Sequence, residues 1–281
     1  MTLIVTAATK DFIFQVADTK LTNIDGTSFD DVLVKTTLVD CYDVKVSISY
    51  TGLAFIEGQR TDIWLAFRLK EFEAWDKCFL EVIDFLKSEL TKAALRDGNL
   101  GKYGLTIVIA GLGINKYGFK DVAIALVTNN ERPVPNCYLI EHFKPEKEFT
   151  KHIFSFNPKD GNLDKDYLED CGYSYISVHG AVDMNKEIGA LRRKIANRLL
   201  KAKTNKQLDE IMNYLVSWIR LQRKSYRVGH LIGNDCTVVH IDKNFKGSLF
   251  FFTDKKERRF ANIISKKRVL INFVKKTKSK T

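Results

Sequence analysis

The sequence contains no apolar run that approaches the ~18 residues needed to cross a bilayer, which argues against a membrane-embedded protein. Its start also lacks the basic segment and long apolar stretch that are typical of a secretory leader. The five cysteines are scattered, and none forms a C-x-x-C pair. This pattern favours free thiols in a reducing compartment over a disulfide framework or a zinc site. We therefore expect a cytoplasmic protein with no metal and no cofactor.

Positive charge is concentrated at one end of the chain. The net charge of the 281 residues is +11, and residues 255–281 hold eleven Lys or Arg residues against Glu257 alone, a local charge of +10. A basic tail can contact nucleic acid or an acidic partner surface. Because no aromatic interleaving or nucleic-acid motif accompanies it, a solvated tail is favoured, and a nucleic-acid partner is left open only by this charge.

The first half of the chain combines short strands with two helices. Apolar runs at 3–8 and 12–17 flank the polar turn 9–11 and predict a β-hairpin. Two more strands follow within the first fifty residues, and connections this short imply an antiparallel sheet. These two strands lie at 32–39 and 44–50. They are followed by helices at 62–75 and 76–95 and by strands at 104–112 and 122–129.

The second half begins with a polar, proline-containing stretch at 130–175, in which only short strands at 137–139 and 153–156 are indicated. Beyond it, the pattern predicts a strand at 175–178, helices at 182–200 and 205–226, and strands at 236–241, 248–253 and 269–274. We expect one domain over residues 1–242, followed by a basic C-terminal extension, 243–281, with one or two strands.

The most distinctive feature is the hydroxyl residue at the start of the first strand. Once Met1 is removed, Thr2 carries a free α-amino group beside its own hydroxyl. A nucleophile with a built-in base is a recognised catalytic arrangement. The predicted hairpin returns Asp18 towards Thr2, and Lys35 stands on the next apolar run. These three residues are the strongest candidates for a catalytic site.

Other motifs in the sequence are weaker evidence for a functional site. Gly111-Leu-Gly113 follows a strand but lacks the third glycine of a dinucleotide fingerprint. Ser177 and His179 meet the requirements of a hydrolase elbow only in part, and the histidines show no metal-ligand spacing.

Several stretches together resemble one family. They are Thr2, the hairpin end Val16-Ala-Asp-Thr-Lys-Leu-Thr22, Lys35, the strand end Ser49-Tyr-Thr-Gly-Leu-Ala54, the strand Tyr103–Gly111 and the late stretch Asn234–Ile241. The pattern resembles the β-type subunits of the proteasome and the bacterial ATP-dependent peptidase HslV, which are N-terminal-nucleophile (Ntn) hydrolases. The resemblance implies an α+β fold, a four-layer αββα sandwich of two antiparallel sheets flanked by helices.

The resemblance also implies catalytic roles. The Thr2 α-amine is the base, the Lys35 ammonium lowers its pKa and stabilises the deprotonated hydroxyl, and Asp18 pairs with Lys35. The backbone N–H of Gly52 donates to the oxyanion. The family's aspartate and serine near the last helix have no counterpart in Arg227–Gly233, and Ser177 is the one hydroxyl of the corresponding glycine-serine stretch.

The same resemblance implies how a peptide or protein substrate is held. The substrate lies extended between the strand edges at Thr22 and Gly52. A pocket for a moderately sized apolar side chain is formed by Leu21, Leu33, Thr37, Tyr50 and Ala54. The family members assemble into rings, so we expect homo-oligomers, with an ATP-dependent unfoldase as a further candidate partner.

Two functions remain open at this point. The first is a threonine-type peptidase or amidohydrolase that passes through an acyl-enzyme. The second is a non-catalytic proteasome-like subunit, or a basic-tailed interaction or assembly protein, that retains only the fold.

Overall fold

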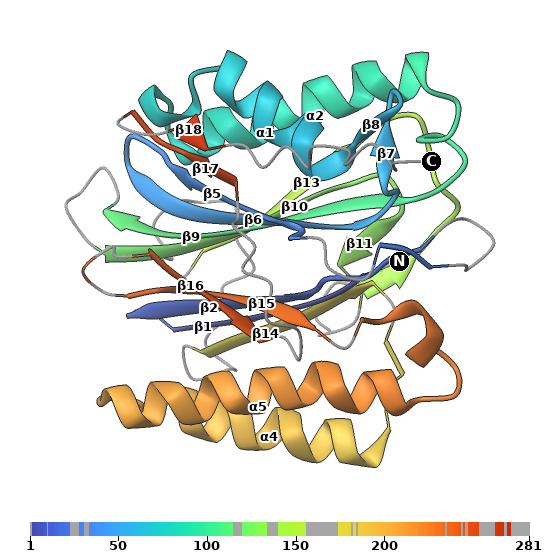
Figure 1. Ribbon diagram of the computed structural model, residues 1–281. Coiled ribbons are helices and arrows are strands. Elements are labelled where there is room, and N and C mark those ends of the chain that lie inside the picture. Colours follow the sequence, from blue (N-terminus) through green and yellow to red (C-terminus); the bar gives the residue numbers. More distant parts are fainter. Residues whose placement is uncertain are drawn as a thin grey trace, which may run out of the picture.

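Two β-sheets pack face to face, and each is covered by helices on its outer side (Figure 1). The computed structural model describes residues 2–9, 11–22, 28–30, 34–114, 120–133, 140–155, 174–180, 182–183, 185–233, 235–242, 244, 247–252, 262–266 and 269–270. The layers follow the order helix, sheet, sheet, helix. The predicted four-layer αββα sandwich is therefore confirmed.

The first sheet contains the N-terminal hairpin, and all its neighbouring strands are antiparallel. Its spatial order is β14 (Ser174–Gly180), β1 (Leu3–Thr9), β2 (Phe12–Asp18), β15 (Cys236–Ile241) and β16 (Gly247–Phe252). In the hairpin, Ile4 lies opposite Ala17. Asp18 consequently reaches the end of the sheet at which Thr2 stands, as the sequence predicts.

Among the described strands, the second sheet has seven against five in the first, and it includes one parallel pair. Its order is β13 (Thr150–Ser155), β10 (Lys120–Thr128), β9 (Leu105–Ile114), β6 (Val44–Gly52), β5 (Thr36–Asp40), β17 (Asn262–Ile264) and β18 (Val269–Leu270). β17 runs parallel to β5, whereas the other neighbours are antiparallel. Three two-stranded ribbons complete the described strands: β3 (Leu21–Thr22) with β4 (Ser28–Asp30), β7 (Phe55–Ile56) with β8 (Gln59–Arg60), and β11 (Glu131–Pro133) with β12 (Ile140–His142).

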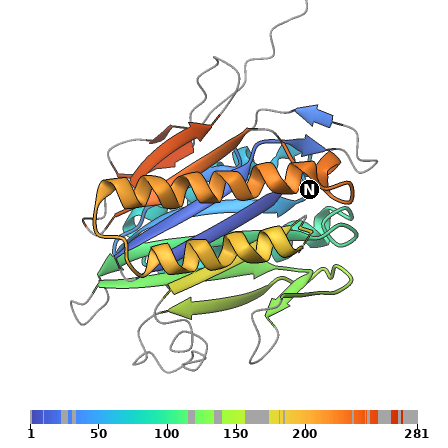
Figure 2. The ribbon, with the colours of Figure 1, turned by 90° about the horizontal axis from the view of Figure 1, so that it is seen from below.

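Each sheet has its own pair of helices. α1 (Thr61–Glu71) and α2 (Phe79–Arg96), joined by the 3₁₀ turn η1 (Ala74–Asp76), cover the second sheet. α4 (Lys186–Leu199) and α5 (Asn205–Lys224) lie side by side across the first sheet (Figure 2), and the 3₁₀ turn η3 (Gly229–Leu231) follows α5. None of the helices among the described residues is long and apolar enough to span a membrane.

The two faces of β6 in the second sheet carry different kinds of side chain, apolar on one face and polar on the other. Val46, Ile48 and Tyr50 join the apolar cluster beneath α1 and α2, whereas the alternating Ser47, Ser49 and Thr51 belong to the other face. Between the sheets, the Gln15 side-chain oxygen accepts hydrogen bonds from Ser47 Oγ at 2.6 Å and Ser49 Oγ at 2.9 Å. These hydrogen bonds offset the free-energy cost of burying hydroxyl and amide groups between the sheets.

Three predicted helix boundaries differ from the structure for local reasons. The helix predicted at 182–200 begins only at Lys186, because Asn185 caps it by accepting from Ile188 N at 3.0 Å. The helix predicted at 62–75 ends at Glu71, because Glu73 adopts a left-handed conformation with φ of 54°. The helix predicted at 76–95 starts only at Phe79, because Cys78 and Glu81 form a capping box. The strand predicted at 137–139 lies outside the described residues.

The described part of the extension 243–281 belongs to the two sheets. β16 pairs with β15 in the first sheet, and β17 and β18 extend the second sheet beyond β5. These strands sit directly beside the elements that position the N-terminal residues.

Candidate active site

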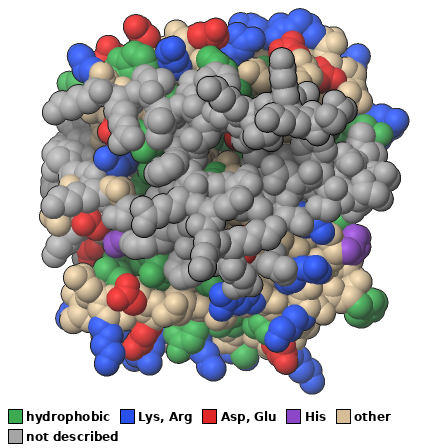
Figure 3. Space-filling view, in the orientation of Figure 1, with side chains coloured by type: hydrophobic (Ala, Val, Ile, Leu, Met, Phe, Trp, Pro, Cys, Tyr) green, Lys and Arg blue, Asp and Glu red, His purple; other side chains and the backbone are tan. Residues whose placement is uncertain are grey.

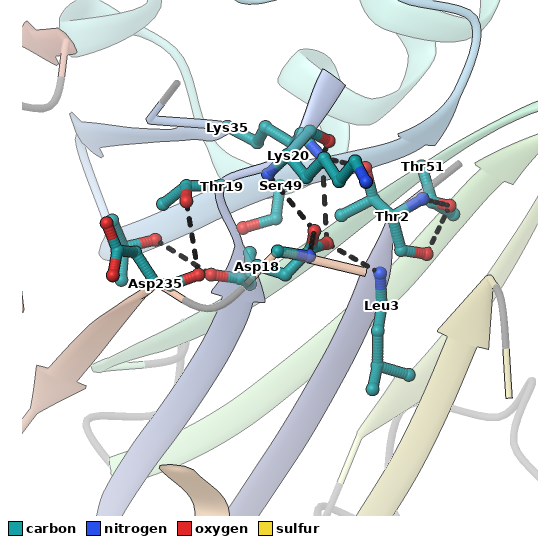
Figure 4. A network of polar contacts seen from close by, with 12 residues as sticks. Thr2, Leu3, Asp18, Thr19, Lys20, Lys35, Ser49, Thr51 and Asp235 are labelled. Carbon is teal, nitrogen blue, oxygen red and sulfur yellow. Dashed lines mark hydrogen bonds and ion pairs between the residues drawn. The ribbon is translucent and has the colours of Figure 1, made fainter. Parts of the chain in front are cut away.

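Thr2 lies between the two sheets, immediately before β1, and is 2% exposed. In β1, Leu3 and Val5 face α4 and α5, whereas Ile4 packs between the sheets, so the alternation directs Thr2 towards the second sheet. Lys35 Nζ donates a hydrogen bond to Thr2 Oγ1 (Figure 4). The structure thus joins two residues that are 33 positions apart in the sequence.

Lys35 is buried, with 1% of its surface exposed, and its ammonium is surrounded by acceptors. It donates to Thr2 Oγ1 and to the Lys20 carbonyl, and it forms an ion pair with Asp18 Oδ1 at 3.5 Å. Two of these oxygens accept hydrogen bonds from the ammonium, and the Asp18 carboxylate supplies an opposite charge beside it. The desolvation cost of the buried charge is offset by these contacts.

The Asp18 carboxylate is held by backbone N–H groups from three parts of the chain. Its Oδ1 accepts from Leu3 N at 2.8 Å, and its Oδ2 accepts from Lys20 N at 3.1 Å and from Gly233 N at 2.9 Å. These bonds hold the carboxylate in one orientation and compensate its burial. The predicted grouping of Thr2, Asp18 and Lys35 is present in the geometry.

Thr51 is a neighbour of Thr2 that the sequence did not single out. Its Oγ1 accepts a hydrogen bond from Thr2 N at 3.2 Å and donates one to Thr2 O at 2.8 Å. Thr2 therefore lies between Lys35 on one side and Thr51 on the other (Figure 4). The available signal was the period-two run Ser47, Ser49, Thr51 on the inner face of β6, which ends one residue before Gly52.

Two glycines allow the backbone to close around this cluster. Gly52, at the end of β6, has φ of 109°, and a Cβ there would lie 2.0 Å from the Gly104 carbonyl oxygen. Gly180, at the end of β14, has φ of 91°, and a Cβ there would lie 1.8 Å from Thr2 O. Both positions therefore require glycine. Gly180 was not among the predicted site residues.

Ser177 is not brought to Thr2. It lies opposite Thr6 in the β1–β14 ladder, whereas Gly180 lies opposite Leu3. Three residues along a strand separate Ser177 from that end of the sheet, a distance of about 10 Å. The expected catalytic contribution of Ser177 thus conflicts with this register. Ser177 lies within β14 with strand residues on both sides, so it does not stand at the strand–turn–helix corner of a nucleophile elbow. His179 Nδ1 contacts Glu131 Oε2 at 2.9 Å.

The predicted substrate-binding residues lie in different parts of the structure. Leu21 and Thr22 form β3, directly after Lys20, and Leu33 lies outside the described residues. Thr37 is buried and paired with Asn262 of β17, and Ala54 follows β6, where its carbonyl accepts from Thr61 N at 2.9 Å.

Tyr50 occupies the face of β6 opposite to Thr51. It is 1% exposed and packs in the apolar cluster beneath α1 and α2. This burial raises the pKa of the Tyr50 phenol well above its ordinary value. The expected role of Tyr50 in a substrate pocket conflicts with its position, because strand alternation turns it away from Thr2.

Within the described residues, no group of three or more His, Cys, Asp or Glu side chains could hold a metal ion. The groups that the structure brings together at the cluster are the Thr2 hydroxyl, the Lys35 ammonium, the Asp18 carboxylate and backbone amides.

No family model and no curated protein sequence matches the chain. Among solved structures, the chain is similar to the Anbu (Gly-1) mutant from Hyphomicrobium sp. strain MC1, with 11% sequence identity and a TM-score of 0.52. The alignment covers 92% of this chain and 89% of that chain. At this identity the likeness shows the fold, which is the proteasome-like Ntn fold.

Proposed function

We propose that the chain is an N-terminal-threonine hydrolase that cuts peptide or other amide bonds, with Thr2 as its nucleophile after removal of Met1. The observation that carries the proposal is the buried Lys35 ammonium donating to Thr2 Oγ1. A threonine nucleophile needs a nearby positive charge, and Lys35 supplies one directly at the Thr2 hydroxyl. The proteasome-like fold is consistent with this chemistry but does not establish it.

The reaction proceeds in two halves. Thr2 Oγ attacks the carbonyl carbon of the scissile amide, and the hydroxyl proton passes to the free α-amine of the same residue. The tetrahedral intermediate then expels the leaving amine, which receives that proton, and an ester on Thr2 remains. A water molecule attacks the ester with the α-amine again as base. This step releases the carboxylic acid and restores the hydroxyl.

The surrounding residues have distinct roles in this mechanism. Lys35 stabilises the developing alkoxide, and Asp18 orients Lys35 through their 3.5 Å ion pair. Gly52 N–H donates to the oxyanion, next to the Thr51–Thr2 contact. A substrate strand lies between β3 and Gly52, and Leu21, Leu33, Thr37 and Ala54 remain the proposed pocket residues.

The first test is the intact mass of the purified protein, followed by labelling with a peptidyl epoxyketone. We expect a protein without Met1 that gains one label, and no label in Thr2→Ala. Retention of Met1, or equal labelling of Thr2→Ala, would contradict the proposal. It would instead favour a non-catalytic subunit that keeps the fold.

A second test concerns Lys35. Lys35→Ala should lower the labelling rate by at least about 10²-fold, because the charge that stabilises the alkoxide is lost. Circular dichroism should still show a folded protein, because Asp18 retains its three backbone donors. Lys45→Ala is the matched control, since Lys45 pairs with Asp40 at 2.8 Å in the β5–β6 turn. A fully active Lys35→Ala protein would refute the mechanism.

A further inference from the structure

We propose that Thr51 is a positioning residue that holds the Thr2 α-amine with its lone pair free for the Thr2 hydroxyl. This inference rests on the proposed function. It assigns to a residue of β6 a task for which Arg227–Gly233 supplies neither an aspartate nor a serine.

The direction of the Thr51 hydrogen bonds follows from counting protons. A hydroxyl has one hydrogen, and Thr51 Oγ1 donates it to Thr2 O at 2.8 Å. Towards Thr2 N, at 3.2 Å, the same oxygen can only accept. A neutral amine gives one N–H to Thr51 and keeps its lone pair, which can then take the hydroxyl proton. A group that donated to the nitrogen would occupy that lone pair.

The Thr51 hydroxyl is confined to this position by its surroundings. Thr51 is 4% exposed and lies opposite Thr106 in the β6–β9 ladder. A Cβ on Gly180 would lie 2.5 Å from Thr51 Oγ1, so the bare Gly180 backbone packs against the hydroxyl. Threonine is also stiff about χ1, because two heavy atoms branch from its Cβ. The hydroxyl is therefore placed before Met1 is removed.

The test compares wild type, Thr51→Val and Thr51→Ser in two measurements. Intact mass first confirms loss of Met1 in each protein. NMR titration with isotope-labelled threonine then gives the pKa of the Thr2 α-amine, and epoxyketone labelling gives the rate across pH. Valine keeps the shape of threonine but has no acceptor, whereas serine keeps the hydroxyl.

We expect Thr51→Val to lower the amine pKa, because an acceptor favours the charged ammonium over the neutral amine. The acid limb of the labelling profile should move to lower pH with it. The maximal rate should fall by about 10-fold, since the lone pair is no longer oriented. Thr51→Ser should restore both values towards wild type.

An unchanged amine pKa and rate in Thr51→Val would overturn the role of Thr51 while leaving the hydrolase proposal intact. So would a Thr51→Ser protein that behaves like Thr51→Val. Absence of labelling in wild type would overturn the hydrolase proposal itself. The two failures are therefore distinguishable.

A second, independent observation concerns the outer helix layer of the first sheet. Residues 186–227, which include α4 and α5, hold twelve Lys or Arg and three acidic residues, a net charge of +9. Residues 61–96, which include α1 and α2, hold six basic and seven acidic residues, a net charge of −1. Lys and Arg side chains project along the α4–α5 layer at the lower edge of Figure 3. The exposed ones are Lys186, Arg193, Lys194, Arg198, Lys201, Lys203, Lys206, Arg220, Lys224 and Arg227.

From this asymmetry we infer that the α4–α5 layer binds the phosphate backbone of duplex nucleic acid. The cations of α5 stand at its two ends, Lys206 in the first turn and Arg220, Arg223 and Lys224 in the last turns, and α4 adds Arg193, Lys194 and Arg198 beside them. A 20-residue helix is about 30 Å long, so the two groups can contact phosphates that are separated along one duplex. The apolar faces of both helices are buried beneath the layer, at Ile188, Leu191, Ile195, Ile211, Leu215 and Trp218. Insertion of the layer into a lipid surface would need such a face to be exposed.

The test measures binding of a random-sequence 30-bp DNA duplex to the full chain by fluorescence anisotropy at two salt concentrations. Combined Arg193→Glu, Lys194→Glu, Arg220→Glu and Lys224→Glu should weaken binding at least about 10-fold and flatten its salt dependence. The matched control reverses Lys70, Lys92, Lys102 and Lys144, which are exposed elsewhere. Equal loss in both proteins, no duplex binding by wild type, or preference for phosphatidylserine vesicles over the duplex would overturn the inference.

Discussion

Burying a lysine ammonium and an aspartate carboxylate is costly unless each polar group finds a partner. At this site the partners come from distant parts of the chain: Asp18 accepts from Leu3, Lys20 and Gly233, and Lys35 reaches Thr2, Lys20 and Asp18. Lys35 donates one of its hydrogen bonds to a hydroxyl, that of Thr2. A hydroxyl held against a buried positive charge has the surroundings that the proposed nucleophile needs, and this is why the proposal rests on Lys35.

Gly180 gives a prediction at the residue scale. Gly180→Ala should destabilise the protein by at least about 3 kcal/mol, because the new Cβ meets Thr2 O at 1.8 Å and the φ of 91° disfavours alanine. Loss of Thr2 labelling should accompany it. The measurement is urea unfolding. Gly189→Ala is the control, since nothing lies within 4 Å of its Cβ and α4 should gain about 0.5–1 kcal/mol. A Gly180→Ala protein as stable as wild type would contradict the described close approach.

At the scale of elements, the site depends on which strands cover its sheet edges. β5 begins at Thr36, directly after Lys35, and β17 pairs with it in parallel from the C-terminal extension. An uncovered edge strand frays and exposes unpaired N–H groups. The extension therefore supports the strand that positions the lysine.

Truncation tests this support. A chain ending at residue 242 loses β16, β17 and β18, so we expect faster amide exchange in β5 and β15 and a lower urea midpoint than in the full chain. A chain ending at residue 270 keeps all three strands and is the control. Equal exchange rates in β5 in both truncated chains would contradict the role assigned to β17.

β15 supplies a pH-dependent prediction. His240 stacks on Phe14 at 4.5 Å, and burial lowers the pKa of its imidazole, although Asp242 and Asp209 act in the opposite direction. Because the folded pKa is lowered, the unfolded chain takes up the proton first, and stability is lost as pH falls below about 6.5.

His240→Phe should remove this contribution and reduce the loss of the urea midpoint between pH 7 and pH 5. Phenylalanine retains the stacking, and among the described residues His240 Nε2 has no hydrogen-bond partner to lose. The exposed His230 provides the control variant, His230→Phe. An unaltered acid dependence in His240→Phe would show that the imidazole contributes nothing.

At the scale of the whole molecule, we expect homo-oligomers, because the family that the sequence resembles assembles into rings. Sedimentation velocity at micromolar concentration should therefore give a mass that is a multiple of the 32.2 kDa chain. A monomer across the accessible concentration range would contradict this expectation. The measurement is independent of Met1 removal and of labelling, so it tests assembly alone.

Local sequence patterns determined much of this protein. Hydrophobic periodicity predicted the β1–β2 hairpin and the helices α1, α2, α4 and α5 to within a few residues, because period and capping residues act over short distances. The hairpin geometry and the family resemblance also predicted that Thr2, Asp18 and Lys35 meet. The side-chain alternation of β6 is also present in the sequence, and it places Tyr50 and Thr51 on opposite faces of the strand.

Only the tertiary structure decided the rest. Thr51 is 49 residues from Thr2, and their contact depends on how the two sheets face each other. The β1–β14 register placed Gly180, and not Ser177, beside Thr2, and no local pattern specifies a register between strands so far apart. The parallel pairing of β17 with β5 likewise depends on the path of the chain around the finished sheet. The opening threonine and its lysine could be predicted from sequence, whereas the groups that hold its nitrogen and its carbonyl were decided by packing.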